Sequence, residues 1–380
     1  MSGFRRTSTR VRNAPPGTRA STHNGQILTS TGVASFDEIL GGGIPLGRTL
    51  VVKQDRYTGY SNLLMKYFIA EGIELSHDVT YITLDSNPED FILELPATVE
   101  NKAATEIEED SDYVPSKQTL SGRNMGALRT PGRNSDKMSI AWRYQSLPKV
   151  SESFTNSSKT MSTYCHTFDL TKQIDKSTLA KANISLINRE TVESAEQGSN
   201  SYEKLLSLLK TQLLQILRVG INSIGSINWD DGDSISEMYK FFYNLRRLVR
   251  GTNIVVFLTL PEYFYQSENG KNYSSIIKRV EFAVDAAIEV ESFAGSTKFF
   301  DANYTSDYHG LIHPVHIFRI NSLIESTRLS NVQLHSLGFK VRRKRFSIEP
   351  FVLPPEDSDK SSKPNPSTSC GTTGSNPLDF

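Results

Sequence analysis

Residues 49–72 have the sequence TLVVKQDRYTGYSNLLMKYFIAEG. The first five, Thr49 to Lys53, form an apolar run that is typical of a buried strand. A polar loop follows, and from Ser61 to Gly72 the large apolar side chains recur at helical spacing. A second apolar run, Val79 to Leu84, comes next. Strand, helix and strand in this order predict a βαβ unit, which requires parallel strands joined by a right-handed crossover.

The alternation of helices and strands continues on both sides of this unit. A short amphipathic helix is predicted over residues 33–40, and the glycines from Gly41 to Gly47 end it. Leucines at helical spacing predict a helix that begins at Tyr202, and another is predicted over residues 236–250. Apolar runs predict further strands at residues 219–224, 253–260, 283–290, 311–318 and 339–348. We therefore expect an α/β fold, with a mostly parallel sheet flanked by helices and an antiparallel extension near the C-terminal end.

A single folded domain is predicted over residues 31–354. Residues 1–30 lack an apolar period and carry arginines among Ser and Thr, which is typical of a disordered basic tail. Residues 355–380 are rich in Ser, Pro, Asp, Lys and Gly and predict a second disordered tail. Within the domain, residues 98–138 are predicted to be a polar surface insertion and residues 145–163 a polar loop, because both are rich in polar residues.

Charge and composition exclude several classes of protein. Lys and Arg number 42, as do Asp and Glu, so no global basic field attracts nucleic acid. No apolar run approaches the roughly 20 residues that span a bilayer, so we expect no membrane-spanning helix. Two cysteines, Cys165 and Cys370, exclude a disulfide framework and a zinc finger. We expect the protein in the cytoplasm and allow for a nuclear pool.

The loop between the first strand and its helix has the spacing of a phosphate-binding P-loop, G-x-x-x-x-G-K-[ST]. Gln54 replaces the first glycine, and Tyr60 replaces the lysine that offsets the charge of a triphosphate. Gly59 and Ser61 match the pattern. The charged residues of the loop are Asp55 and Arg56. We favour a βα turn that has kept the fold and lost the ligand over a weak or specialised nucleotide site.

A magnesium–triphosphate site also needs an acid at the end of a later strand. The strand predicted over residues 219–224 ends in Gly225 and Ser226, with no carboxylate at its tip. Three acids come a few residues later, too late for that geometry, and predict a solvated turn: Asp230, Asp231 and Asp233. Both halves of the nucleotide site are thus altered, and we expect no nucleotide turnover by this loop.

Other catalytic or metal-binding arrangements are not predicted. His309, His313 and His316 lack a Cys or a further acid at a spacing that completes a ligand set. Pro314 interrupts the strand on which they are predicted to lie. No Ser-His-Asp or Cys-His arrangement with a nucleophile context is present, and G-x-S-x-G is absent. We therefore expect no catalytic residue and no bound metal.

Several segments carry a resemblance to a known family. The entry to the domain and the P-loop-spaced turn resemble the core of RecA-type ATPases. Within that superfamily the chain is similar to the family of fourth subunits of the Elongator complex. The matching segments follow one another in the expected order over about residues 30 to 353, and they are residues 30–37, 41–47, 60–73, 140–144, 166–170 and 309–313.

The resemblance implies a non-catalytic structural subunit. Members of the family resemble RecA folds that join two sister subunits, the fifth and the sixth, in a hetero-hexameric ring. That ring is an accessory lobe of Elongator, which modifies the wobble uridine of certain transfer RNAs with chemistry that belongs to another subunit. The ring is expected to bind tRNA, and ATP binding at the joints between subunits stays open. Two alternatives are kept: a stand-alone RecA-like ATPase with an altered pocket, and a scaffold for protein contacts alone.

In RecA-like rings two loops line the central opening, here residues 228–234 and 262–274. The second loop offers aromatic side chains that stack on unpaired bases, with one cation beside them. Packing of these side chains within the loop is the alternative. A basic run on the last predicted strand is a further candidate. The alternatives are that it pairs with acids across a subunit joint, or that its charge keeps an edge strand soluble. The candidate RNA contacts are Tyr263, Tyr265, Lys271, Tyr273, Arg342, Arg343, Lys344 and Arg345.

Overall fold

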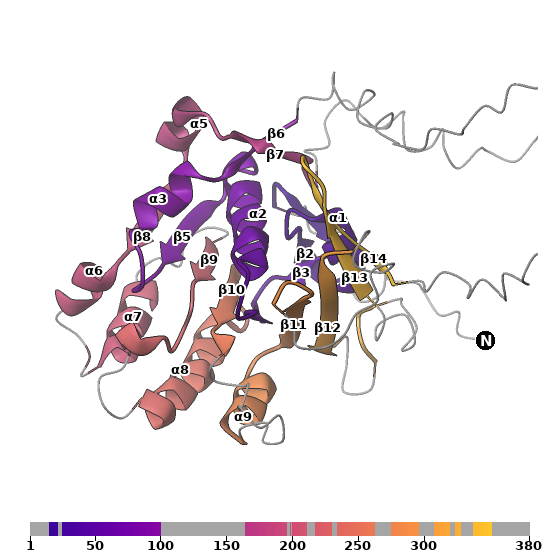
Figure 1. Cartoon of the computed structure of the whole chain (residues 1–380). Helices are drawn as coiled ribbons and strands as arrows, with labels where there is room; N and C mark the ends of the chain where they lie inside the picture. Colours follow the sequence, from indigo (N-terminus) through magenta and orange to yellow (C-terminus); the bar gives the residue numbers. More distant parts are fainter. Residues whose placement is uncertain are drawn as a thin grey trace, which may run out of the picture.

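The computed structural model describes residues 15–21, 25–99, 164–195, 198, 200–210, 217–229, 234–262, 275–295, 308–319, 324–327 and 337–351. Among these residues nine strands form one sheet, in the order β14-β13-β12-β11-β4-β10-β9-β5-β8 (Figure 1). The predicted polar loop 145–163, the tail 355–380 and all but the first two residues of the predicted insertion 98–138 lie outside the described residues.

Six neighbouring strands of this sheet are parallel. They are β4 (Arg48–Lys53), β5 (Asp78–Ile82), β8 (Ile184–Ile187), β9 (Leu217–Ile221), β10 (Ile254–Leu260) and β11 (Ala286–Ser292). Antiparallel pairing then adds β12 (Gly310–His316), β13 (Leu337–Val341) and β14 (Phe346–Pro350). Every residue of β10 is buried, as expected for a central parallel strand covered on both faces. The prediction of an α/β, RecA-like fold with a C-terminal antiparallel extension is confirmed.

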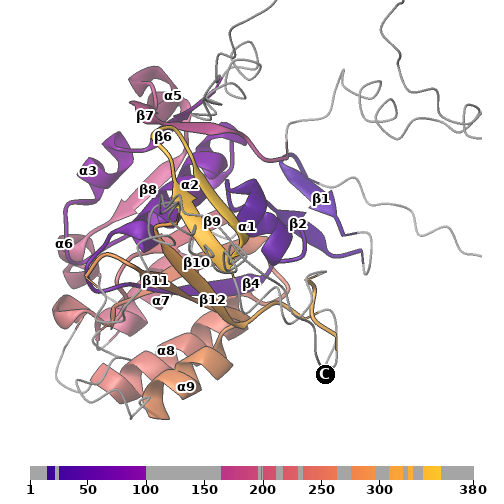
Figure 2. The same ribbon diagram turned by 45° about the vertical axis from the view of Figure 1, so that its right-hand side comes forward.

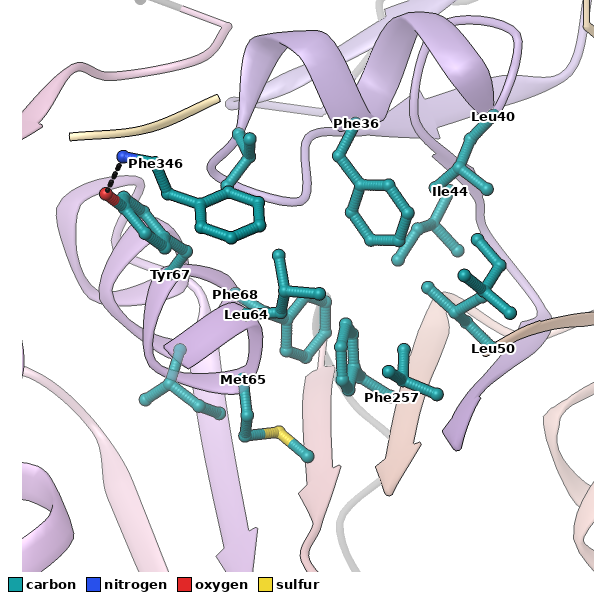
Figure 3. Packing of buried hydrophobic residues seen from close by; sticks show 14 of the residues in the cluster. Phe36, Leu40, Ile44, Leu50, Leu64, Met65, Tyr67, Phe68, Phe257 and Phe346 are labelled. Atoms are coloured by element: carbon teal, nitrogen blue, oxygen red, sulfur yellow. Dashed lines mark hydrogen bonds between the residues drawn. The ribbon is translucent and has the colours of Figure 1, made fainter. Parts of the chain in front are cut away.

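Two hydrophobic clusters lie on opposite faces of the sheet. Val255 and Phe257 of β10 belong to the first cluster and Val256 and Leu258 to the second, because successive side chains of a strand point to opposite faces. The first cluster packs under α1 (Ala34–Ile39) and α2 (Tyr60–Glu74) (Figure 3), and also under α3 (Pro88–Leu93). The second packs under α6 (Arg189–Glu193), α7 (Ser201–Lys210), η3 (Ile227–Trp229), α8 (Ser234–Val249) and α9 (Ser275–Ala283). No described helix combines the length and apolar character needed to cross a membrane.

Two smaller sheets lie beside the main one. The first contains β1 (Thr18–Ala20), β2 (Ile27–Thr29) and β3 (Ile44–Pro45). The second pairs β6 (Pro96–Thr98) with β7 (Phe168–Gln173), and α5 (Lys176–Lys181) follows it. The prediction that residues 1–30 form a disordered tail is wrong for β1 and β2, whereas residues 1–14 lie outside the described residues. Strands of three residues are too short for a period to be visible, and contacts with distant residues hold them in place.

A buried arginine anchors this N-terminal segment to the sheet. Arg218 on β9 is fully buried, and its guanidinium donates to the Ser30 backbone oxygen at 2.9 Å and to Thr29 Oγ1 at 2.7 Å. It also donates to the Phe68 backbone oxygen at 3.1 Å and, through Nε, to His77 Nδ1 at 3.1 Å. β2 is therefore held by hydrogen bonds that a sequence pattern does not reveal.

His77 makes this network sensitive to pH. Burial and the neighbouring Arg218 lower the pKa of His77 to about 4, whereas an unfolded chain takes up this proton near pH 6.5. The stabilising effect of neutral His77 is complete above pH 6.5 and is lost as the pH falls toward 4. Between pH 7 and pH 4 we expect His77→Gln to gain about 3 kcal/mol of unfolding free energy relative to wild type. Urea unfolding at both pH values checks this, and a pH-independent difference would contradict it.

The last predicted strand, residues 339–348, is two strands. β13 and β14 form a hairpin, and the turn between them, residues 342–345, is closed by the Arg342 N–H donating to the Arg345 backbone oxygen at 2.9 Å. The prediction that the basic run lies on a strand is therefore wrong. Outer N–H groups of β14 donate to Tyr67 Oη (Figure 3) and Ser35 Oγ, which protects this edge of the sheet.

Candidate functional site: the altered phosphate loop

The loop from Gln54 to Gly59 lies at the carboxyl end of β4, in the middle of the sheet between β10 and β11. In open α/β sheets this is the edge where ligands bind. The Gln54 N–H donates to the Leu260 backbone oxygen at 2.8 Å, which fixes the start of the loop against the end of β10. α2 begins directly after Gly59. The loop therefore has the position of a P-loop. Whether it can bind phosphate depends on its side chains.

Tyr60 occupies the lysine position, and its side chain packs against other aromatic rings. Its ring makes edge contacts with Phe339, at 4.8 Å between ring centroids, and with His309 at 6.5 Å. Burial and the carboxylate of Asp55 raise the pKa of Tyr60, which keeps the phenol neutral. The residue therefore attaches the start of α2 to the C-terminal hairpin and supplies no positive charge to a phosphate.

Lys53, the residue just before the loop, does not replace the missing lysine. Its side chain is fully buried, and its ammonium group lies 3.0 Å from Glu281 Oε1 and 2.6 Å from Glu289 Oε2. The one cation at the end of β4 thus lies between two carboxylates. The charge is committed to joining β4, α9 and β11, because separating it from both acids would leave buried charges unpaired.

A network of neutral groups joins the start of the loop to the ends of β9 and β10. The Gln54 amide donates to Thr259 Oγ1 at 2.8 Å and to Ser223 Oγ at 3.0 Å. The Thr259 hydroxyl donates to Asn222 Oδ1 at 2.7 Å. Ser223 adopts a left-handed conformation, with φ of 49°, and its N–H donates to Thr259 Oγ1 at 2.7 Å. These side chains hydrogen-bond to one another. None of them carries the charge that a magnesium–phosphate group requires.

The strand-end position differs from the prediction. β9 ends at Ile221, so the residue at its tip is Asn222 and not Gly225. The Asn222 amide therefore stands where a magnesium-ordering carboxylate is expected. The strand end still lacks an acid, but the residue in question is Asn222 and not Gly225. Asp230, Asp231 and Asp233 lie outside the described residues.

The remaining loop residues organise the turn. Asp55 Oδ2 accepts from the Tyr57 N–H at 3.2 Å and from the Thr58 hydroxyl at 2.9 Å, an arrangement that tightens a loop. Arg56 is largely exposed and lies 3.9 Å from Glu262 Oε2. Ser61, which keeps the hydroxyl position of a P-loop, is buried. Neither charged residue of the loop is held in a cradle for phosphate.

Gly59 tests whether the loop still needs its glycine. It has φ of −97°, and a methyl group added there would meet no atom within 4 Å. We expect Gly59→Ala to change the unfolding free energy by less than about 1 kcal/mol. Gly43→Ala is the matched control, because its φ is 120° and its new Cβ would clash with the Thr29 backbone oxygen. Urea unfolding measures both variants. If Gly59→Ala lowered the unfolding free energy as much as Gly43→Ala does, the loop would have no space for a methyl group at residue 59.

The predicted RNA contacts separate into two groups. The basic run forms the exposed turn between β13 and β14, and all four of its side chains are exposed: Arg342, Arg343, Lys344 and Arg345. The aromatic loop lies outside the described residues, with Tyr263, Tyr265, Lys271 and Tyr273. The four basic side chains therefore lie together on one turn, whereas the prediction for the aromatic loop stays a prediction.

The three histidines considered for metal binding have separate neighbours. His313 Nε2 lies 2.8 Å from Glu291 Oε2, and His316 Nε2 lies 3.3 Å from the Val284 backbone oxygen. The Val341 N–H donates to His309 Nδ1 at 3.2 Å. In the described ranges no group of three or more His, Cys, Asp and Glu side chains is placed to hold a metal ion.

Sequence reasoning missed the residues that close the site. They lie far from the loop in sequence: Asn222 just after β9, Thr259 on β10, Glu281 on α9 and Glu289 on β11. A strand assignment ending at Ile221 would have pointed to Asn222. No sequence signal links Lys53 to its two acids, because only the strand order brings them together.

Comparison with known proteins assigns the chain to a family. The model of a family described as PAXNEB protein matches residues 11–380. The chain is 35% identical over 377 residues to Elongator complex protein 4 of Xenopus laevis, with 92% of this chain and 85% of that protein covered. Identity to Elongator complex protein 4 is 33% for Homo sapiens, over 91% and 81% of the two chains, and 24% for Saccharomyces cerevisiae, over 91% and 77%.

These matches cover nearly the whole chain, including β4, the altered loop and the C-terminal hairpin. They agree with the resemblance that the separate sequence segments predicted. The chain belongs to the PAXNEB family, together with the fourth subunits of Elongator to which it is similar.

Proposed function

We propose that this protein is a non-catalytic structural subunit of the Elongator complex. The observation that carries the proposal is the altered loop: Tyr60 and Asn222 replace the two charged groups that a working nucleotide site needs, and Lys53 is committed elsewhere. The names of the relatives support the choice of complex. A RecA-like fold that has lost its nucleotide chemistry serves by binding other subunits.

The partners that we propose are two sister RecA-like subunits, the fifth and the sixth, in a hetero-hexameric ring attached to the larger Elongator subunits. Exposed aromatic side chains on α8 and α9 support a role in assembly: Tyr239, Tyr243 and Phe282 are 42%, 66% and 82% exposed. In such a ring this chain needs no nucleotide of its own, and ATP binding is confined to joints where a neighbour supplies the missing charges.

The ring is proposed to bind tRNA and to support modification of the wobble uridine to its 5-carbonylmethyl type. We place this work in the cytoplasm, with a nuclear pool. The basic turn between β13 and β14 supports RNA binding, because four exposed cations gather on one short turn. The aromatic loop with Tyr263, Tyr265, Lys271 and Tyr273 is the second proposed contact, through stacking on unpaired bases.

Tagged purification from the native cell, followed by mass spectrometry, tests the proposal. Co-elution of two sister RecA-like subunits and the larger Elongator subunits is expected. The alternative is a stand-alone RecA-like ATPase with an altered pocket. Self-association alone, together with ATP turnover by the purified chain, would favour that alternative and end the ring proposal.

The basic turn is tested by neutralising it. We expect changing Arg342, Arg343, Lys344 and Arg345 together to Ser to weaken binding of a single-stranded RNA by about tenfold or more and to flatten its salt dependence. The matched control removes the same charge from exposed positions on and next to α7, α8 and α9, with Lys210, Arg247, Arg250 and Arg279 changed to Ser. Fluorescence titration at several salt concentrations measures both, and equal losses would mean that only net charge matters.

A further inference from the structure

The helices α7, α8 and α9 form a surface that combines aromatic and basic side chains. α8 packs against both of the others, and Figures 1 and 2 show α8 and α9 side by side. One side of α8 carries Tyr239, Tyr243 and Arg247, which recur every four residues and are all exposed. Arg250 extends this stripe past the helix end, where its N–H still donates to the Arg246 backbone oxygen at 3.1 Å. The stripe therefore changes from aromatic to basic along its length.

α9 continues this surface beside the stripe. The Phe282 side chain is exposed, and Arg246 of α8 donates to the Phe282 backbone oxygen at 3.4 Å, which joins the two helices. Lys278 and Arg279 are exposed on α9, four and three residues before Phe282. Exposed aromatic side chains that gather on two contacting helices are typical of an interaction surface, because water disfavours such a patch.

A groove between α7 and α8 extends the surface on the other side of the stripe. Its volume is about 700 Å³. Sites that bury a ligand of drug size have roughly 300–1,000 Å³, so the groove has space for several side chains of a partner. Leu206 of α7 and Leu248 of α8 line it with apolar atoms, and Lys210 and Arg247 bring two cations to it beside the acid Glu203. Aliphatic walls accept apolar side chains and offer no ring on which a base could stack.

The surface carries an excess of positive charge, because the acids of α8 and α9 are already paired. Glu237 is the acid of α8, and its Oε1 lies 2.6 Å from Lys240 Nζ. Glu281 is the acid of α9, and its Oε1 lies 3.0 Å from the buried Lys53 Nζ. No salt bridge between described residues includes four further exposed cations of this surface, which are Lys210, Arg247, Arg250 and Arg279. Charge complementarity therefore favours a negative partner surface.

We propose that this surface binds an acidic segment with apolar side chains that belongs to another Elongator subunit. The apolar side chains of the partner occupy the groove and pack on Tyr239, Tyr243 and Phe282, while its carboxylates lie at the four cations. A protein is favoured over RNA because the groove walls are aliphatic. The contact rests on the proposed function, since another subunit of the complex must supply the segment.

Zero-length cross-linking of carboxylates to amines in the complex, purified through the tagged full chain, locates the partner. Lys210 at the groove and Lys278 beside Phe282 are the reporter amines, and mass spectrometry identifies the acids joined to them. We expect both lysines to be linked to acids of the same Elongator subunit. Links only to acids of this chain, or no links at all, would overturn the contact.

Two variants test whether the surface holds the linked subunit. One carries K210S, R247S, R250S and R279S, and the other carries Y239S, Y243S and F282S. All seven side chains are exposed, so we expect urea unfolding midpoints equal to that of wild type. Each variant is expected to bind the linked subunit about tenfold more weakly, measured as the amount retained on the tagged chain over a range of concentrations.

The matched control is the quadruple Ser variant of the basic turn, residues 342–345, which loses the same charge from a different part of the molecule. It is expected to retain the linked subunit as wild type does. An equal loss in this control would mean that only net charge matters, which would overturn the contact. Loss of RNA binding by K210S, R247S, R250S and R279S with the subunit retained would assign the surface to RNA instead.

The same purification separates failure of this contact from failure of the proposed function. If wild type and both surface variants retained the Elongator subunits equally, the contact would be overturned and membership in the complex would stand. If the wild-type chain retained no Elongator subunit, the proposed function and the contact would both be wrong.

Discussion

Replacing Arg218 by Met is expected to lower the free energy of unfolding by about 3–5 kcal/mol. The guanidinium is fully buried and donates to four acceptors on three different segments, so its loss leaves each acceptor without that donor. Two buried acids, Asp37 and Glu71, lie close enough for Arg218 to balance their charge. A loss of this size is a large part of the total stability of an ordinary domain.

Arg250→Met is the control for Arg218→Met. Arg250 is exposed just beyond α8, so its replacement is expected to change the unfolding free energy by less than about 0.5 kcal/mol. Urea unfolding of both variants provides the comparison. An Arg218→Met protein within about 1 kcal/mol of wild type would mean that the guanidinium network contributes little.

The network has a structural consequence beyond stability. Asp37 accepts from the Ser30 hydroxyl at 2.5 Å and from the Thr31 N–H at 2.7 Å, and burial raises its pKa to about 6. Glu71 accepts from the His166 N–H at 3.0 Å. Together these contacts tie the entry of the domain, α2 and the start of β7 to one arginine. This explains why segments far apart in sequence are ordered as one unit.

Replacing Lys53 by Met is expected to cost about 3–5 kcal/mol for a related reason. Glu281 and Glu289 then face each other without the ammonium group that separates their charges. The apolar part of Met fills the same space, so the loss reports charge and not volume. Urea unfolding at pH 7 measures it.

A triple variant separates charge from packing at this site. Adding Glu281→Gln and Glu289→Gln to Lys53→Met removes the uncompensated charges, and we expect recovery to within about 1 kcal/mol of wild type. No recovery would show that the acids have other structural duties. The result bears on function as well, because a lysine needed only for stability is not available to a nucleotide.

Much of the fold and part of the site follow from local sequence. The apolar run of β10 is buried along its whole length, and the helical period of residues 236–250 became α8. Both are local signals: burial on two faces or one face imposes a period on neighbouring residues. The replacement of the P-loop lysine by Tyr60 is likewise visible in sequence, because it depends on spacing alone.

Only the tertiary structure decided which distant groups meet. The order of the strands brings Asn222 and Thr259 to Gln54, and both carboxylates to Lys53, across separations that leave no period in the sequence. Arg218 holds β2, β1 pairs with β2, and the basic run became a turn because β13 and β14 pair. Local patterns determine elements, since each residue is constrained by its neighbours in the chain. The closed loop, the buried charges and the basic turn depend on packing between elements, which local patterns do not encode.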